Sequence, residues 1–176
     1  GYSLFDKEAF RAAHPAYSLD PAMERDLILR CSFYDNWNQE IIWANTQVNT
    51  SYNRMFQQLC HPNFSSYSHS LACYQFIGVP LKIAEQFYTR NGLPIGNDLE
   101  WAGANPYELK TADANQSLYL EPNYTTVRLN FYREPRYYSS LRFDGGTWIS
   151  MMSDAQYIDP KPEDLHVLKC RIGQVN

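Results

Sequence analysis

The chain has 176 residues, and this length with a 44% hydrophobic share predicts one domain with a sizeable core. The formal net charge is −4 and no run of Lys or Arg occurs, which argues against a protein that follows a nucleic-acid backbone. Aromatic residues make up 15% of the chain and charged residues only 19%, so neutral or weakly charged ligands with flat apolar faces fit best.

The first predicted element is a short helix near the N-terminus. Asp6 is a capping residue, and the helix is expected to continue to about Ala13. Phe5 precedes the cap and Phe10 lies four positions into the helix, which is the arrangement of a hydrophobic staple.

A second helix is predicted from Asp20-Pro21 to about Tyr34, because a capping residue is followed by proline at the first helical position. Residues 40–43 are rich in β-branched and aromatic side chains and predict a short strand. Residues 45–78 show no sustained period. We expect a long, structured loop there, and such loops are often functional.

The middle of the chain predicts a helix that opens at Pro80 and is followed by Asn91-Gly92, either its C-terminal cap or a tight turn. Residues 96–124 are loop-like and form a second candidate surface. The side chains expected to share one face of the helix are Ile83, Ala84, Phe87 and Tyr88.

The last ordered region predicts a helix whose first turn holds Pro135, with Tyr137 and Tyr138 on one face. Residues 141–149 then predict a hairpin, because two glycines at 145–146 supply positive φ at its turn. Residues 165–172 could form either a strand or a helix. These elements together predict a mainly α, irregular α+β domain with small hairpins and long loops.

Four sequence motifs occur in a characteristic order. They are NQEIIW at 38–43, AEQFY at 84–88 leading to NGLPI at 91–95, REPRYY at 133–138 and FDGGTW at 143–148. In this order they resemble the SusD/RagB family of outer-membrane glycan-binding lipoproteins of Bacteroidetes-type bacteria. The motif residues expected to have structural roles are Asn91, Gly92, Pro94, Arg133, Glu134, Pro135, Arg136, Asp144, Gly145, Gly146 and Trp148.

The resemblance implies a single SusD-like domain over residues 1–176 that corresponds to the middle portion of a longer protein. The flanking tetratricopeptide-type helices and the lipidated N-terminal cysteine of the family would lie outside this sequence. The implied function is non-catalytic binding of oligosaccharide or polysaccharide, such as starch, at the outer cell surface. The implied partner is a SusC-like TonB-dependent transporter that imports the glycan, and no cofactor is expected.

Sugar binding requires aromatic rings for the apolar C–H face of the sugar and neutral polar groups for its hydroxyls. The predicted loops supply both kinds of group. The candidate glycan-binding residues are Tyr52, Asn53, Phe64, Tyr67 and Trp101. The alternative for each ring is that it packs the loop onto the core, because aromatic residues also dominate core burial.

Two enzyme-like or interaction-based alternatives remain open in the sequence. A glycoside hydrolase would need two carboxylates across a cleft, and the candidates are Glu40, Glu134 and Asp144. Each of them has a ready local role in a strand, a helix start or a turn, so we expect no catalytic residue. The other alternative is a plain protein-interaction module.

A zinc site is a further alternative, because the ligand types that zinc prefers occur in one short stretch. These residues are Cys60, His61, His69 and Cys73. Cys60 and His61 are adjacent, which makes joint ligation awkward, and only His69 and Cys73 have the spacing of two ligands on one helix face. The default for these residues is solvated His and buried Cys, so no metal is expected there.

Overall fold

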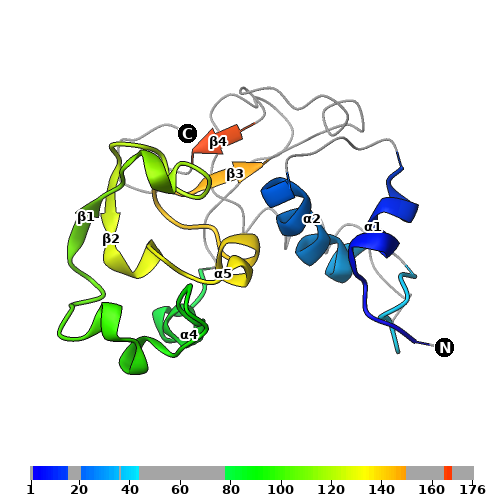
Figure 1. Ribbon diagram of the computed structural model, residues 1–176, viewed down its shortest axis with the longest axis horizontal. Helices are drawn as coiled ribbons and strands as arrows, with labels where there is room; N and C mark the ends of the chain where they lie inside the picture. Colours follow the sequence, from blue (N-terminus) through cyan, green and yellow to red (C-terminus); the bar gives the residue numbers. More distant parts are fainter. Residues whose placement is uncertain (1, 16–20, 36, 44–77, 150–164, 168–176) are drawn as a thin grey trace. The chain divides into compact units, whose positions relative to one another are not determined.

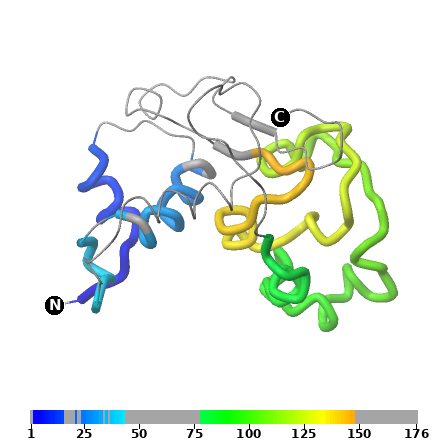
Figure 2. Tube along the Cα trace, turned by 180° about the vertical axis from the view of Figure 1, so that it is seen from behind, coloured from blue at the N-terminus to red at the C-terminus, as the bar shows by residue number. Residues whose placement is uncertain are grey.

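The structure is a computed structural model that describes residues 2–15, 21–35, 37–43, 78–149 and 165–167. The chain divides into two compact units, one formed by residues 1–47 and 149–165 and the other by residues 48–148 and 166–176. We describe each unit by itself. Residues 78–149 form the longest continuous stretch of described chain (Figure 2).

The first unit contains two helices that pack against each other, α1 (Lys7–Ala13) and α2 (Pro21–Tyr34) (Figure 1). The backbone N–H groups of Glu8 and Ala9 donate to Asp6 Oδ1, each at 3.0 Å, and this confirms the predicted cap. Both rings of the predicted staple, Phe5 and Phe10, are buried in one apolar cluster with side chains of α2. The staple therefore also joins the two helices.

The predicted strand at residues 40–43 is wrong, since these residues form a turn followed by irregular backbone. Ile42 is 76% exposed and Trp43 is 83% exposed. Asn38 explains the difference, because its side-chain oxygen accepts from the Glu40 N–H at 2.9 Å and its backbone oxygen accepts from the Ile41 N–H at 3.2 Å. These local hydrogen bonds hold the backbone in a turn instead of an extended strand.

The second unit consists of short helices and strands joined by irregular chain, which confirms the predicted irregular α+β fold. The described elements that follow α2 in the chain are α4 (Leu81–Gln86), η1 (Ile95–Asn97), η2 (Leu99–Trp101), β1 (Leu109–Thr111), η3 (Ala114–Gln116), β2 (Thr125–Val127), η4 (Arg128–Asn130), α5 (Pro135–Ser140), β3 (Thr147–Ile149) and β4 (Leu165–Val167). All of them belong to the second unit except Ile149 of β3 and Leu165 of β4, which are assigned to the first. β1 and β2 pair in antiparallel fashion with Lys110 opposite Thr126, and β3 pairs with β4.

One of the buried apolar clusters of the second unit joins α4 and α5, and another contains Ala112, Leu120 and Phe131. Tyr137 and Tyr138 of α5 are buried together with Ala84 of α4 and Leu129. Pro135 occupies the first turn of α5, which confirms the predicted start of this helix. The two short helices therefore share one apolar cluster even though they lie about fifty positions apart in the sequence.

α4 is shorter than predicted. It ends at Gln86, and Phe87 already has extended backbone with φ −63° and ψ 149°. Phe87 and Tyr88 lie beyond the end of the helix, so the expectation that they share one helix face with Ile83 and Ala84 is wrong; within the helix only Ala84 is buried. The chain turns away after Gln86 before a full second turn of helix can align these side chains.

Asn91-Gly92 forms a turn and not the cap of α4. The Gly92 N–H donates to the Thr89 carbonyl at 2.9 Å, and the Thr89 N–H donates to the Leu93 carbonyl at 2.9 Å. Gly92 has φ +73°, a conformation that glycine adopts without steric cost. Asn91 reinforces the turn, because its side-chain amide donates to Asp98 Oδ2 at 3.1 Å.

The predicted hairpin at residues 141–149 is correct in its turn and wrong in its pairing. Gly145 has φ +80° and the Gly146 N–H donates to the Phe143 carbonyl at 3.0 Å, so a tight turn is present. However, β3 pairs with β4, and Gly146 bridges to Leu120. Leu141 and Phe143 instead pack against the core around α5. The side chain of Trp148 lies outside the described part of the structure.

Within the described residues, no helix has the length and apolar character that crossing a membrane would require.

Candidate functional site

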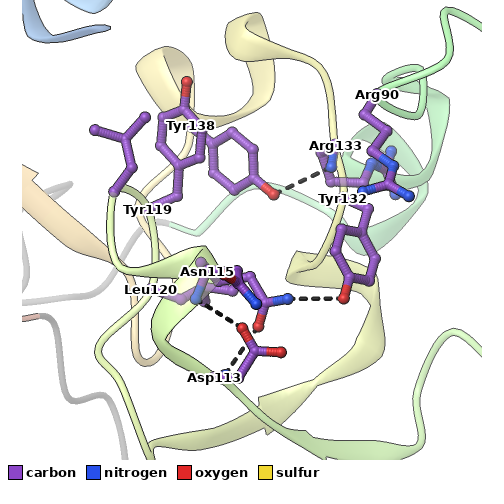
Figure 3. A pocket seen from close by; sticks show the side chains of 10 residues that line it. Arg90, Asp113, Asn115, Tyr119, Leu120, Tyr132, Arg133 and Tyr138 are labelled. Atoms are coloured by element: carbon purple, nitrogen blue, oxygen red, sulfur yellow. Dashed lines mark hydrogen bonds between the residues drawn. The ribbon is translucent and has the colours of Figure 1, made fainter.

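A pocket of about 360 Å³ in the second unit is the candidate functional site. Its walls come from η3 and the turn after it, from the segment that leads into α5, and from the turn after α4. The lining residues are Arg90, Asp113, Asn115, Gln116, Leu118, Tyr119, Leu120, Tyr132, Arg133 and Tyr138. Figure 3 shows Tyr119 and Tyr138 on one side of the pocket, and Tyr132 with Arg90 on the other.

One wall of the pocket is a stacked pair of tyrosine rings. The rings of Tyr119 and Tyr138 are parallel within 3°, and their centroids lie 3.8 Å apart. Two hydrogen bonds fix the position of Tyr138: its hydroxyl donates to the Asn130 carbonyl at 3.1 Å and accepts from the backbone N–H of Arg133 at 3.1 Å. Burial raises the pKa of Tyr138 above its usual range, so this phenol stays neutral. The buried ring thus supports the half-buried ring of Tyr119.

Tyr132 forms the opposite wall in an unusual backbone conformation. Its φ is +53°, which is rare for a bulky side chain and often marks a functional position. The Arg90 guanidinium lies 4.5 Å from the centre of the ring, and Lys110 Nζ lies 4.6 Å from it. The backbone N–H of Arg90 also donates to the Tyr132 carbonyl at 2.7 Å. These contacts fix the ring against the pocket.

The polar floor of the pocket is built by the start of η3. Asp113 Oδ1 accepts from the Asn115 N–H at 2.8 Å, and Gln116 Oε1 accepts from the Asp113 N–H at 3.0 Å, which together form a capping box. Gln116 Nε2 donates to the Tyr132 hydroxyl at 2.7 Å. Within the described residues no hydrogen bond engages the exposed side-chain amide of Asn115, so this amide can serve a ligand.

Both arginines that line the pocket are engaged by hydrogen bonds. Arg90 donates to both carboxylate oxygens of Glu100, at 3.1 and 2.7 Å, and this hydrogen bonding raises the pKa of Arg90. The guanidinium of Arg133 donates to backbone carbonyls, and burial lowers its pKa. Asp113 is the carboxylate among the lining residues. The arrangement suits a neutral ligand that has a flat apolar face and a rim of hydroxyls.

The carboxylates considered for hydrolysis have structural contacts where the structure describes them. Glu134 pairs with Arg136 at 2.7 Å and accepts from the Tyr88 N–H at 2.9 Å. Asp144 accepts from the Tyr124 hydroxyl at 2.7 Å. Glu40 belongs to the other unit. Neither Glu134 nor Asp144 lines the pocket.

The structure corrects one predicted sugar contact. Trp101 is buried, with 4% of its surface exposed, and the guanidinium groups of Arg128 and Arg133 lie 5.5 and 5.7 Å from its ring centre. The expectation of an exposed ring at this position is wrong, because the indole is buried within the unit beside these two guanidinium groups. The other predicted contacts, Tyr52, Asn53, Phe64 and Tyr67, lie outside the described residues and stay predictions.

The residues that line the pocket were not among the glycan contacts predicted from the sequence, although most of them lie in the segment 96–124, which was predicted as a candidate surface. One pattern that could have indicated a binding site is Asn115-Gln116 three positions before Tyr119, because it places two amides beside an aromatic ring. A second pattern is Tyr132 directly before the REPRYY motif. The residues weighed as an alternative zinc site, at which no metal was expected, lie outside the described part of the chain; they are Cys60, His61, His69 and Cys73.

The pocket combines tyrosine rings with amide and carboxylate groups in a small irregular α+β unit. The sequence profile of the SusD family matches residues 39–167, which is well over half of the chain and includes every residue that lines the pocket. The chain belongs to the SusD family, as its motifs indicated. Membership indicates carbohydrate binding as the general function and the outer membrane as the usual setting. No curated protein matches the chain.

Proposed function

We propose that this chain binds an oligosaccharide without chemical reaction at the pocket between Tyr119 and Tyr132. Stacked tyrosines beside the available amide of Asn115, inside the part of the chain that defines the family, support this proposal most strongly. The bound glycan is a segment of a nutrient polysaccharide held at the outer cell surface. A SusC-like TonB-dependent transporter receives it, and a lipid anchor in the full-length protein holds the binder at the membrane.

The pocket matches one or two sugar rings in both size and chemistry. Its volume of about 360 Å³ lies at the small end of the usual range for ligand pockets. A pyranose ring placed against Tyr119 would set its C–H face on the tyrosine and direct hydroxyls toward Asn115 and Asp113. The rigid support of Tyr119 by Tyr138 lowers the ordering cost of binding. Tyr52, Asn53, Phe64 and Tyr67 remain proposed glycan contacts on the ground of their residue types alone.

The proposal is tested first by affinity gel electrophoresis of the intact protein in gels that contain one polysaccharide each. The panel holds starch, other neutral plant and microbial glycans, and acidic glycans. We expect at least one neutral polysaccharide to retard the protein. Migration that is unchanged across the whole panel would contradict glycan binding and favour a protein-interaction module.

The role of Asn115 is tested with a matched pair of variants. Asn115→Ala removes the amide that no described hydrogen bond engages, and we expect it to weaken glycan binding about fivefold, the effect of one lost neutral hydrogen bond. Asn97→Ala changes an exposed amide of η1 that does not line the pocket, and retardation should stay unchanged. Equal effects of the two substitutions would place the glycan elsewhere on the protein.

A further inference from the structure

Three possible metal ligands come together in the first unit, outside the part of the chain that matches the family profile. They are His14, Cys31 and Asp35, and one ligand atom from each lies within 4.8 Å of the others. His14 Nε2 is 2.9 Å from Asp35 Oδ2. Among the described residues, three or more His, Cys, Asp or Glu side chains come close enough to share a metal ion at His14, Cys31 and Asp35, and not in the pocket.

The packing of α1 on α2 brings the three side chains together. Cys31 and Asp35 are four positions apart, and the Asp35 N–H donates to the Cys31 carbonyl at 2.9 Å, so Asp35 continues the helical path of α2. His14 is the C-cap of α1, and its N–H donates to the Phe10 carbonyl at 2.9 Å. Cys31 belongs to the apolar cluster that joins the two helices, and the imidazole packs against the Phe10 ring at 5.0 Å. The core of the unit therefore positions this group.

We propose that His14, Cys31 and Asp35 bind one zinc ion. An imidazole nitrogen, a thiolate and a carboxylate oxygen are all ligands that zinc takes in proteins. Tetrahedral zinc holds its ligand atoms about 3.5 Å apart, so the His14–Asp35 pair opens slightly and the thiolate closes in when the ion enters. A water molecule completes the fourth position.

Charge and exposure also suit zinc. In the zinc complex the cysteine sulfur is bound as a thiolate, and the ion neutralises its charge together with that of the Asp35 carboxylate. Cys31 is 3% exposed, whereas the side chains of His14 and Asp35 are 21% and 18% exposed. The thiolate is thus shielded from solvent, and the other two ligands leave a path for the ion. Bound zinc links the end of α1 to the end of α2 and stabilises this unit.

The test is metal titration of the intact 176-residue chain after removal of metal with a chelator. Zn²⁺ added in competition with a chromophoric chelator should bind at one equivalent. Co²⁺ should give a sulfur-to-cobalt charge-transfer band in the near ultraviolet, which reports the thiolate directly. The variants Cys31→Ser, His14→Gln and Asp35→Asn should each weaken Zn²⁺ binding at least tenfold, and Cys31→Ser should also abolish the charge-transfer band.

The double variant C60S/C73S is the matched control, because it removes the two cysteines of the alternative zinc site and leaves the group at α1 and α2 intact. We expect it to keep full Zn²⁺ affinity. Binding that survives Cys31→Ser but is lost in C60S/C73S, or no Zn²⁺ binding by the wild type, would overturn the proposal. Circular dichroism verifies folding of each variant. If Cys31→Ser unfolds, the nearly isosteric Asp35→Asn decides, since unchanged affinity there also overturns the site.

Discussion

Arg133 is a buried cation whose guanidinium donates to three backbone carbonyls. Two of them, Ala84 and Phe87, lie at the end of α4 at 2.9 and 2.5 Å, and the third is Leu129 at 3.4 Å. The carbonyls of Ala84 and Phe87 have no helical partner because α4 ends there. Arg133, the first residue of the REPRYY motif, thus caps the C-terminal end of α4. This structural role explains why the motif contains an arginine here.

Arg133→Met should destabilise the second unit by about 2–4 kcal/mol, because it leaves buried carbonyls without donors. Arg136→Met is the control. Arg136 is exposed and pairs with Glu134 at 2.7 Å, so its loss should cost no more than about 1 kcal/mol. Urea unfolding followed by tryptophan fluorescence measures both values. Equal losses in the two variants would mean that Arg133 does not cap α4.

Asp26 of α2 is buried, and its Oδ1 has no hydrogen-bond partner in the structure. Burial raises its pKa from 3.8 to about 6, and Arg30 and Arg25 oppose this shift only in part. Between these two pKa values the folded chain keeps a proton that the unfolded chain has lost. Stability contributed by this group therefore falls as the pH rises through that window and is fully lost above it.

Asp26→Asn removes this cost without changing the size of the side chain. The variant should be more stable than the wild type at about pH 7.5 by about 3 kcal/mol, and the difference should vanish at about pH 4. Urea unfolding at both pH values measures the two free energies. A difference that does not depend on pH would show that Asp26 titrates normally in the folded chain.

At the scale of secondary-structure elements, the correct predictions are those that depend only on residues close together in the sequence. The cap at Asp6 and the proline start of α5 depend on residues within one turn, and both predictions are confirmed. Strand pairing depends on distant chain, and here the predictions failed. Residues 40–43 have strand-forming side chains but are held in a turn by Asn38, and β3 pairs with β4 instead of with residues 141–143.

Three glycines allow the backbone and steric contributions to the turns to be separated. Gly96→Ala should be almost neutral, because the added methyl group meets open space. Gly92→Ala should cost about 1 kcal/mol, because only its φ of +73° opposes the new side chain. Gly145→Ala should cost clearly more, since at φ +80° the new Cβ would also lie 2.4 Å from Tyr124 Cδ1. Urea unfolding of the three variants should follow this order, and a Gly145 variant as stable as Gly96→Ala would contradict the described turn.

At the scale of the whole molecule, the family was predictable because its motifs are continuous in sequence, and the profile match confirms them. The binding residues were harder to predict. Whether an aromatic ring is exposed depends on distant side chains, and Trp101 is covered by Arg128 and Arg133, which come from a later segment. The pocket likewise joins Arg90, Tyr119 and Tyr132 from three separate segments.

The two proposed sites lie in different units, so each can be tested without the other. The zinc group belongs to α1 and α2, outside residues 39–167, and the glycan pocket lies within them. Failure of zinc binding would leave the glycan proposal untouched. Loss of glycan binding in a pocket variant should likewise leave the Co²⁺ spectrum unchanged.

Isothermal titration calorimetry with an oligosaccharide from the retarding polysaccharide tests the central claim, that this SusD-family chain binds glycan between its pocket tyrosines. Tyr119→Ala removes the ring that stacks on Tyr138, and affinity should fall about tenfold or more, since roughly 1.5 kcal/mol of apolar contact is lost. Tyr107→Ala, which changes an exposed ring that does not line the pocket, should bind like the wild type. Unchanged affinity in Tyr119→Ala, or an equal loss in Tyr107→Ala, would contradict the claim.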